Sequence, residues 1–493
     1  MAELKMLAFD LGASNGRAVY GVWKGENLKI KEIHRFENEP VTVRGKLYWD
    51  VLRIFYEMKN SMRICMGQGL EFDSIGVSSW GNTIGLFDGN GDLLANPYHY
   101  RDGSVSKTEG DFYRKYSRER LFEETLYKPM DIQPTVLWDY LKKKKKWMAE
   151  NAAYILMISD IFNYFLSGVK ASEKTMAATS AMLDMRNGNW KESLMKALGI
   201  PMGCFPPIVE NGTLLGECSK EIAEELHLPN RPKVIAVAGH DTASASGCVD
   251  EDILEESAYL SCGTWSCMGC TVEKEIEDVR LAKAGITNDI GLYGSKQLRF
   301  NHTGLWILQE CRRYWESGEA GRPMTWTELM RQAEAAEPFL AAIDTEAPDF
   351  FFPGDMAMKV KEYCRRTGQR IPESKGEICR VVLESLAYRY RYSVECLQHF
   401  AGYRFKKLWI LGGGAKNELL CRMTANAAGI PVQTGLTEAS VMGNFLQQAL
   451  TMGIAADVKQ GREVLYKGIE KKAYMPEETE KWNEHYQYLK AHW

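Results

Sequence analysis

The sequence predicts an α/β protein made of two related domains, and three observations support this. At 493 residues the chain is too long for one hydrophobic core of ordinary size. Strand-like and helix-like segments alternate along it, which is typical of α/β architecture. A pattern of apolar strand, small polar turn and apolar strand occurs at residues 5–23 and again at 257–272. We therefore expect domains over residues 1–247 and 248–493, with the boundary at the acidic stretch 248–257 and a polar, partly helical tail from about residue 460.

The elements follow in order from the spacing of apolar residues. From Val51 to Cys65 apolar residues recur at helical spacing, and Asp50 before them is a favourable N-cap. The next stretch, residues 73–88, contains two apolar strands separated by a polar turn. Residues 405–429 predict a strand, a glycine turn and a helix, so the glycines lie where a backbone can approach a ligand closely.

Composition excludes several classes of protein. Hydrophobic residues make up 45% and charged residues 26%, as in ordinary globular proteins. With 61 basic and 65 acidic side chains the net charge is -4, so no global positive field attracts nucleic acid or an acidic membrane. No apolar run is long enough to span a membrane, and the first residues lack the pattern of a signal peptide. We expect a cytoplasmic protein without nucleic-acid or membrane partners.

Two local clusters favour structural roles. The twelve cysteines are scattered, which indicates reduced thiols. Cys267 and Cys270 have a metal-like spacing but no second pair follows, so we interpret them as small buried residues of a strand. The lysines at 142–146 are expected to form the solvated face of one helix over residues 138–152.

The first candidate site is the turn from Asp10 to Arg17, DLGASNGR. Its glycines allow a tight turn with exposed backbone N–H groups, and Arg17 can neutralise phosphate charge. Asp10 ends a buried strand, where a carboxylate needs a cation or a donor, and a Mg²⁺ ion with bound waters would fit. A purely conformational role for these glycines stays open, because the motif is neither a Walker loop nor a dinucleotide fingerprint.

The second candidate site is VIAVAGHDTASASG, residues 234–247. An apolar strand delivers Asp241 to the edge where ligands of α/β proteins collect. Phosphoryl transfer to an alcohol needs such a carboxylate to accept the hydroxyl proton. We expect His240 to position rather than to act as a second base. The alternative is that Asp241 only caps the following helix.

Two further turns indicate a nucleotide site. In SCGT, residues 261–264, Thr264 can donate to a terminal phosphate, and in LGGGAKN, residues 411–417, the glycines leave room for adenine or ribose. Between them, Asn301 precedes a helix that carries Gln309. Each turn alone could be merely conformational, and their joint occurrence favours binding.

In order and spacing, these stretches resemble the FGGY carbohydrate kinases, and within them the rhamnulokinases, up to about residue 455. The matching pieces are DLGASNGR at 10–17, GKLYWD at 45–50, PYHYRD at 97–102, GHDT at 239–242, SCGTWS at 261–266, NHTGLW at 301–306, GGGAKN at 412–417 and EASVMGN at 438–444. The resemblance implies two ribonuclease-H-like, actin-like ATPase domains, with ATP and the sugar meeting in a cleft between them.

Carried over residue by residue, the resemblance implies a role for each candidate. Asp241 would be the catalytic base, and the sugar would contact Gly81, His240, Thr242 and Asn301. The nucleotide would contact Ala13, Ser14, Asn15, Gly16, Arg17, Thr264, Gln309, Gly413 and Gly414. Asp10 would act through Mg²⁺ and its waters. The first domain would serve mainly the sugar and the second mainly ATP.

The implied reaction is transfer of phosphate from MgATP to an L-ketose, first of all L-rhamnulose to its 1-phosphate, by a monomer or homodimer. One departure bears on the sugar: rhamnulokinase-like sequences usually read close to DTWGVDF where this chain has SSWGNT at 78–83, so Thr83 replaces an acid. Such a change can alter which ketose is accepted. Kinases of L-fuculose, L-xylulose or another ketose therefore stay open, as does an actin-like nucleotide-binding module without sugar kinase activity.

Overall fold

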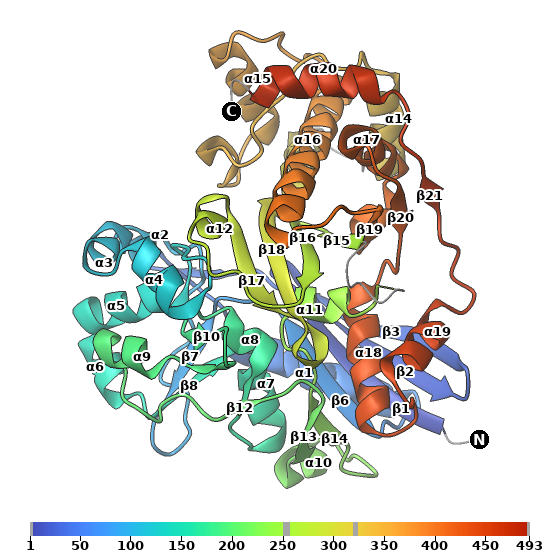
Figure 1. Cartoon of the computed structure of the whole chain (residues 1–493). Helices are drawn as coiled ribbons and strands as arrows, with labels where there is room; N and C mark the ends of the chain where they lie inside the picture. Colours follow the sequence, from blue (N-terminus) through green and yellow to red (C-terminus); the bar gives the residue numbers. More distant parts are fainter. Residues whose placement is uncertain (1–2, 250–256, 319–323, 491–493) are drawn as a thin grey trace. The chain divides into compact units, whose positions relative to one another are not determined.

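The computed structural model describes residues 3–249, 257–318 and 324–490 (Figure 1). The chain divides into two compact units. Unit 1 comprises Met1–Asp250, Glu273–Gln297 and Ala439–Gly468, and unit 2 comprises Glu251–Val272, Leu298–Glu438 and Ile469–Trp493. A single boundary at residue 247 does not describe this division, because residues 273–297 and 439–468 return to unit 1. Most of the acidic stretch expected at the boundary lies outside the described residues.

Unit 1 contains a six-stranded sheet of order β13-β14-β6-β1-β2-β3. Its strands are β1 (Glu3–Leu11), β2 (Asn15–Lys24), β3 (Asn27–Glu37), β6 (Ser74–Ser79), β13 (Thr213–Glu217) and β14 (Lys233–Ala236). β1 and β2 form an antiparallel hairpin, whereas β6 runs parallel to both β1 and β14. Because carboxyl ends of parallel strands meet at one edge of a sheet, the segments after β1, β6 and β14 lie at the same edge.

Short ladders and helices complete the first 250 residues of unit 1. The ladders are β4 (Val41–Val43) with β5 (Lys46–Tyr48), β7 (Ile84–Phe87) with β8 (Tyr154–Met157), β9 (Ser172–Glu173) with β12 (Ile208–Val209), and β10 (Leu183–Asp184) with β11 (Asn189–Trp190). The helices are α1 (Val51–Gly67), α2 (Gly103–Ser106), α3 (Glu109–Lys115), α4 (Arg118–Thr125), α5 (Pro134–Lys144), α6 (Lys146–Asn151), α7 (Ile158–Ser167), α8 (Lys174–Ala178), α9 (Glu192–Leu198), α10 (Lys220–Glu225) and α11 (Asp241–Ser246).

Two later helices, α18 (Ala439–Thr451) and α19 (Val458–Tyr466), also belong to unit 1. α18 lies against β1 and β6 through buried polar side chains rather than a purely apolar face. The Gln448 side chain accepts from Ser74 Oγ at 2.6 Å and donates to Leu7 O at 3.3 Å, and Gln447 Oε1 accepts from Ala238 N at 2.7 Å. Gly76 permits this approach, because a Cβ there would overlap Asn444 Oδ1.

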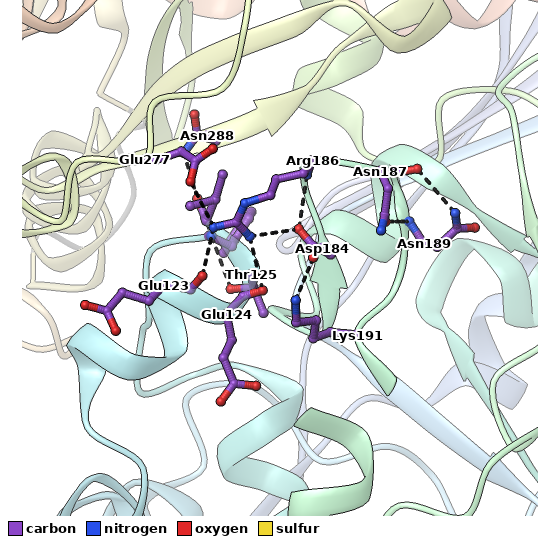
Figure 2. A network of polar contacts seen from close by, with 12 residues as sticks. Glu123, Glu124, Thr125, Asp184, Arg186, Asn187, Asn189, Lys191, Glu277 and Asn288 are labelled. Carbon is purple, nitrogen blue, oxygen red and sulfur yellow. Dashed lines mark hydrogen bonds and ion pairs between the residues drawn. The ribbon is translucent and has the colours of Figure 1, made fainter. Parts of the chain in front are cut away.

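The insertion at residues 273–297 contains α12 (Arg280–Lys283), β17 (Ile286–Ile290) and a 3₁₀ turn, η1 (Leu292–Gly294). Figure 2 shows the polar network that holds it within unit 1. Arg186 donates to Asp184 Oδ1 at 3.1 Å, to Glu277 Oε2 at 3.3 Å and to carbonyl groups at the end of α4. Asn288 donates to the carbonyl that follows α4 at 2.8 Å. These donors satisfy carbonyl groups that every helix end leaves unpaired.

Unit 2 contains strands in the order β18-β16-β15-β19-β20-β21. They are β15 (Ser257–Cys262), β16 (Trp265–Val272), β18 (Lys296–Thr303, of which unit 2 takes the residues from Leu298), β19 (Lys407–Leu411), β20 (Val432–Thr434) and β21 (Ala473–Tyr474). β15 pairs antiparallel with β16 and parallel with β19, as β1 does with β2 and β6. β20 continues in parallel and β21 closes antiparallel, as β14 and β13 do. The two units therefore repeat one strand order, as expected from the two similar hairpins.

The helices of unit 2 are α13 (Trp306–Gly318), α14 (Trp326–Ala335), α15 (Met356–Arg366), α16 (Lys375–Ala401), α17 (Glu418–Ala428) and α20 (Thr479–Lys490), with 3₁₀ turns η2 (Pro348–Phe350) and η3 (Gly413–Lys416). The long helix α16 starts at a capping box formed by Ser374 and Glu377. Trp482 of α20 lies on Tyr388 of α16, with ring centroids 5.0 Å apart, so part of the tail packs into unit 2.

Several local expectations are confirmed. Asp50 caps α1 by accepting from Arg53 N, and the described cysteines are free thiols. Cys267 and Cys270 lie in strand β16 as expected, but only Cys270 is buried and Cys267 is half-buried. The prediction of a single helix around the lysine run is wrong: the helix breaks at Lys145, whose φ of -138° and ψ of 45° are not helical, and α5 and α6 lie on either side. Among the described residues, no helix combines the length and the apolar character needed to cross a membrane.

Candidate active site

The turn between β1 and β2 is closed by its own backbone and by neighbouring side chains. Gly12 N donates to Asn15 O at 2.9 Å, and the buried Asn38 donates from Nδ2 to Gly12 O at 2.8 Å. Ser14 and Asn15 are exposed, and Ala13 is half-buried. The turn is thus a rigid, outward-facing loop at the carboxyl edge of the sheet, which suits contact with a ligand.

Arg17 and Asp10 pair with each other across this hairpin, where the register sets them opposite. Arg17 Nε and Nη2 donate to Asp10 Oδ2 at 2.9 and 2.7 Å, and both side chains are only 14% exposed. The donor that a carboxylate needs at the end of a buried strand is therefore Arg17. Gly16 has a packing role, since a Cβ there would lie 2.5 Å from the ring of Phe36.

Asp241 is the first residue of α11, and residues 237–240 join it to the end of β14. The N-cap of α11 is His240, which makes no side-chain capping bond, so Asp241 is not the helix cap. The Asp241 side chain is 35% exposed, and Thr242 Oγ1 donates to its Oδ1 at 3.1 Å. The buried His240 has its Nε2 3.7 Å from the same oxygen. The strand end therefore presents a partly exposed carboxylate with a histidine beside it.

Gly81 lies in the turn between β6 and β7, at the same edge of the sheet. Ser79 N donates to Gly239 O at 2.7 Å, which joins this turn to the one that carries Asp241. Asn82 follows with φ of 60°, in the left-handed region that asparagine tolerates. Thr83 is fully buried, and its hydroxyl accepts from Trp80 Nε1 at 3.0 Å. Its side chain thus orients the indole of Trp80.

Two other motifs meet next to this turn. Trp49 N donates to Pro97 O at 2.9 Å, and the Trp49 ring lies 4.2 Å from Trp80 and 4.1 Å from His99, centroid to centroid. Burial lowers the pKa of His99 to about 3, so this imidazole is neutral. Arg101 N donates to His99 Nδ1 at 3.0 Å, which leaves the proton on Nε2. The aromatic group formed by Trp49, Trp80 and His99 therefore includes an N–H donor.

Sequence reasoning missed the segment 173–179, which contains α8 and underlies both turns. Glu173 Oε2 accepts from Gly239 N at 2.9 Å, and Thr175 Oγ1 accepts from His240 N at 3.3 Å. Thr179 Oγ1 accepts from Asn82 N at 3.1 Å. An acid and a threonine before a short helix form a recognisable cap pattern, but nothing in the sequence indicates that they contact these distant turns.

In unit 2, the side chains of Thr264 and Gln309 contact each other. Thr264 Oγ1 donates to Gln309 Oε1 at 3.1 Å. The turn that carries Thr264 also binds the start of α13, because Leu305 N donates to Gly263 O at 2.9 Å and Gly304 N to Thr264 O at 3.1 Å. Asn301 lies on β18, the strand that precedes α13, and its Oδ1 is buried without a hydrogen-bond partner.

The glycine turn after β19 lies beside Cys262, at the end of the neighbouring parallel strand β15. Gly412 has a φ of 76°, which glycine adopts without strain, and its N donates to Leu436 O at 3.0 Å. Gly414 is buried against Cys262, whereas Gly413 is exposed and has no described atom within 4 Å of the place where a Cβ would lie. One glycine therefore serves packing and the next leaves open space.

The predicted residues thus form two groups, one in each unit. In unit 1, Asp10, the turn 13–17, Gly81 and His240–Thr242 lie at the carboxyl edge of one sheet. In unit 2, Thr264, Gln309, Gly413 and Gly414 lie around the carboxyl ends of β15 and β19, with Asn301 on β18. Among the described residues, no group of three or more histidine, cysteine, aspartate or glutamate side chains that could hold a metal ion occurs.

Comparison with known proteins gives consistent results. Residues 5–248 match the N-terminal domain of the FGGY family of carbohydrate kinases, and residues 258–452 match its C-terminal domain. A rhamnulokinase of Bacteroides thetaiotaomicron is 34% identical over 483 residues, which cover 98% of each chain. A rhamnulokinase of Enterococcus faecalis is 32% identical over 465 residues, covering 92% of this chain and 91% of that one.

Solved structures show the fold. A ligand-bound xylulose kinase of Lactobacillus acidophilus superposes with a TM-score of 0.79 at 16% identity, covering 99% of this chain and 97% of the other. A glycerol kinase of Plasmodium falciparum with ADP reaches 0.78 at 15% identity, with the same coverage. The expected fold of two ribonuclease-H-like, actin-like domains is confirmed.

Proposed function

Because the chain belongs to the FGGY family of carbohydrate kinases, we propose that it transfers the γ-phosphoryl group of ATP to L-rhamnulose and forms L-rhamnulose 1-phosphate. The expectation of a carbohydrate kinase is confirmed, and ATP is the phosphoryl donor of this family. The choice of sugar is supported by the rhamnulokinases that this chain matches at 30–34% identity over most of its length.

The observation that carries the mechanism is the partly exposed carboxylate of Asp241 at the carboxyl edge of the sheet. Asp241 would accept the proton of the sugar hydroxyl as that oxygen bonds to the γ-phosphorus and the bond to the β-phosphate oxygen breaks. Thr242, by donating to Oδ1, holds the carboxylate in one orientation. His240, buried beside it, would restrict how the sugar approaches.

The nucleotide contacts are proposed for residues of both groups. The Thr264 hydroxyl, fixed by Gln309, would donate to a terminal phosphate, and the open space at Gly413 would receive adenine or ribose. The turn at Ala13–Asn15, in which Ser14 and Asn15 are exposed, would offer backbone N–H groups to phosphate oxygens.

This arrangement fits a magnesium ion that is bound to the protein through water molecules. Asp10 gives one oxygen to Arg17, so it would meet Mg²⁺ through water rather than as one of several protein ligands. Such a site agrees with the coordination of Mg²⁺ in proteins, where the ion usually retains several water ligands and binds mainly to substrate phosphates. The bound ion would neutralise charge on the phosphates of ATP.

A second candidate is a kinase of another ketose, and Thr83 favours it. The family pattern has an acid at this place, whereas Thr83 here is buried and bonded to Trp80. A site that loses an acceptor for a sugar hydroxyl should discriminate differently among ketoses.

The test is phosphorylation of a panel of ketoses by the purified protein, measured as sugar-dependent release of ADP. L-rhamnulose should give the highest kcat/KM. Asp241→Asn should lower kcat at least about 100-fold, the lower end for loss of a general base. Asp457→Asn is the matched control, because Asp457 caps α19 by accepting from Gln460 N and asparagine caps equally well. Wild-type turnover by Asp241→Asn would refute the assignment of Asp241 as the general base. A rate of ADP release that does not depend on the sugar would refute the proposed sugar kinase activity.

A further inference from the structure

We propose that the segment 173–179 is the positioning element of the sugar group in unit 1, because it fixes the turn that carries Asp241 and the turn that carries Gly81. The inference rests on the proposed function, since it assigns a role to the segment only if these two turns bind and activate the sugar. None of its residues is proposed to touch the sugar.

Glu173 holds the first turn by its backbone. Its carboxylate is completely buried and accepts from the N–H groups of Thr175 and Met176, from the Thr175 hydroxyl at 2.6 Å, and from Gly239 N at 2.9 Å. Two of these bonds cap α8 in the ordinary way. The bond to Gly239 reaches 66 positions along the chain and places a fixed acceptor two residues before Asp241.

The two threonines extend this hold to both turns. Thr175 Oγ1 donates to Glu173 and accepts from His240 N, so the chain is fixed at two successive residues before Asp241. Thr179 Oγ1 donates to Met176 O at 2.8 Å and accepts from Asn82 N, next to Gly81. Each hydroxyl therefore both donates and accepts, which fixes its direction.

Steric fit around the segment is equally close. A Cβ on Gly239 would overlap Ser159 Oγ and lie 3.1 Å from both Glu173 Oε2 and Met176 Cβ. A Cβ on Gly81 would lie 2.9 Å from Cγ2 and 3.0 Å from Cβ of Thr179. Both turns therefore rest directly on the segment, and close packing transmits small shifts instead of absorbing them.

These bonds matter for catalysis because phosphoryl transfer depends on positioning. The protein supplies little covalent chemistry in this reaction, so the place of the base relative to the sugar hydroxyl largely sets the rate. A buried backbone N–H without an acceptor is energetically unfavourable, so the turn would shift until this N–H finds another acceptor. The expected result is a shifted Asp241 or Gly81 in a protein that still folds.

The experiment uses pairs of variants that differ by one hydroxyl. Thr179→Val and Thr175→Val keep the shape of the side chain but remove the acceptor, whereas Thr179→Ser and Thr175→Ser keep the hydroxyl. Ser172→Ala is the matched control, because Ser172 is buried next to the segment and its Oγ has no hydrogen-bond partner. Each full-length variant is assayed for kcat, the KM of the ketose, the KM of ATP and the melting temperature.

We expect each valine variant to lose about ten- to hundred-fold in kcat/KM for the ketose, the range of small misplacements, with the KM of ATP changed less than about two-fold. Serine variants should recover most of the loss, and Ser172→Ala should match the wild type.

Three results would overturn the inference. Wild-type kinetics in both valine variants, with Asp241→Asn inactive, would leave the proposed function standing and remove the positioning role. An equal loss in the serine and valine variants would show that keeping the hydroxyl does not rescue the kinetics, and would rule out these hydrogen bonds as the cause. If Asp241→Asn itself keeps wild-type turnover, the proposed function fails, and the inference fails with it.

Discussion

Adjacent glycines in the turn after β19 should respond in opposite ways to the same substitution. Gly414 is buried, and a Cβ there would lie 2.5 Å from Cys262 Cβ, overlap its Sγ and approach its carbonyl oxygen to 3.1 Å. Cys262 cannot yield easily, because it is fully buried in β15 and its Sγ contacts Ser266 and Tyr390. Gly413 is exposed and has no described atom within 4 Å of the place for a Cβ.

The magnitudes follow from packing and chain entropy. Overpacking a well-filled core costs about 1–3 kcal/mol, and replacing glycine by alanine returns about 0.4–1 kcal/mol by restricting the unfolded chain. Gly414→Ala should therefore lose about 1–2 kcal/mol, whereas Gly413→Ala should equal or slightly exceed the wild type. At about 2–4 °C per kcal/mol for a unit of 150–250 residues, the melting temperature of Gly414→Ala should fall by about 2–8 °C.

The kinetic effects should be the reverse of the stability effects. If adenine or ribose lies against Gly413, a methyl group there should raise the KM of ATP about ten-fold or more, as one unwanted methyl in a fitted site does. Circular dichroism melts and an ADP-release assay at saturating ketose measure both quantities. A Gly414→Ala protein as stable as Gly413→Ala would refute the packing argument. A wild-type KM of ATP in Gly413→Ala would refute the nucleotide assignment.

Three further outcomes are expected. Thr264→Val should raise the KM of ATP about three- to ten-fold and leave the KM of the ketose unchanged, because only a phosphate donor is lost; a change confined to the ketose would reverse the assignment. Arg17→Ala leaves the Asp10 carboxylate without its two guanidinium donors, so urea unfolding should show a loss of about 1–3 kcal/mol, and adding Asp10→Asn should restore part of it; no recovery would contradict the pairing. Burial raises the pKa of Glu173 from 4.5 to about 7, so its stabilising contribution is fully present below pH 4.5 and is lost as the pH rises toward 7. Between pH 5 and 7 the urea midpoint of the wild type should therefore fall relative to Glu173→Gln, and parallel curves would speak against a buried titrating carboxyl.

Local sequence patterns were enough to predict several strands and turns. The hairpins at residues 5–23 and 257–272 and the turn after β19 were predictable, because glycine turns between apolar runs specify strand ends. The pairing of Asp10 with Arg17 was also within reach: a hairpin turning at Ala13 and Ser14 sets these two residues opposite, where opposite charges pair.

Contacts between distant segments could not be predicted in the same way. The role of Glu173 depends on a bond to Gly239, and no local pattern reports a partner so far along the chain. Helix α18 presents a similar difficulty, since Gln447 and Gln448 are typical of a solvated face but are fully buried here. Burying these amides is energetically acceptable only because backbone and side-chain groups of unit 1 form hydrogen bonds with them. Those hydrogen bonds exist only in the folded unit.

Because α18 belongs to unit 1 but lies near the carboxyl end of the chain, unit 1 cannot finish folding until late in synthesis on the ribosome. Leu7 and Ser74 leave the ribosome early, but the side chain that bonds to both belongs to Gln448, near the carboxyl end. Until that helix emerges, the face of β1 and β6 around Gly76 lacks its cover, and contacts of such long sequence separation form late because the loop must close first. A nascent chain that stops before Ala439 therefore carries an unfinished first unit, although most of its residues are already synthesised; pulse proteolysis of stalled chains would detect this as protection of unit 1 that arises only after α18 emerges.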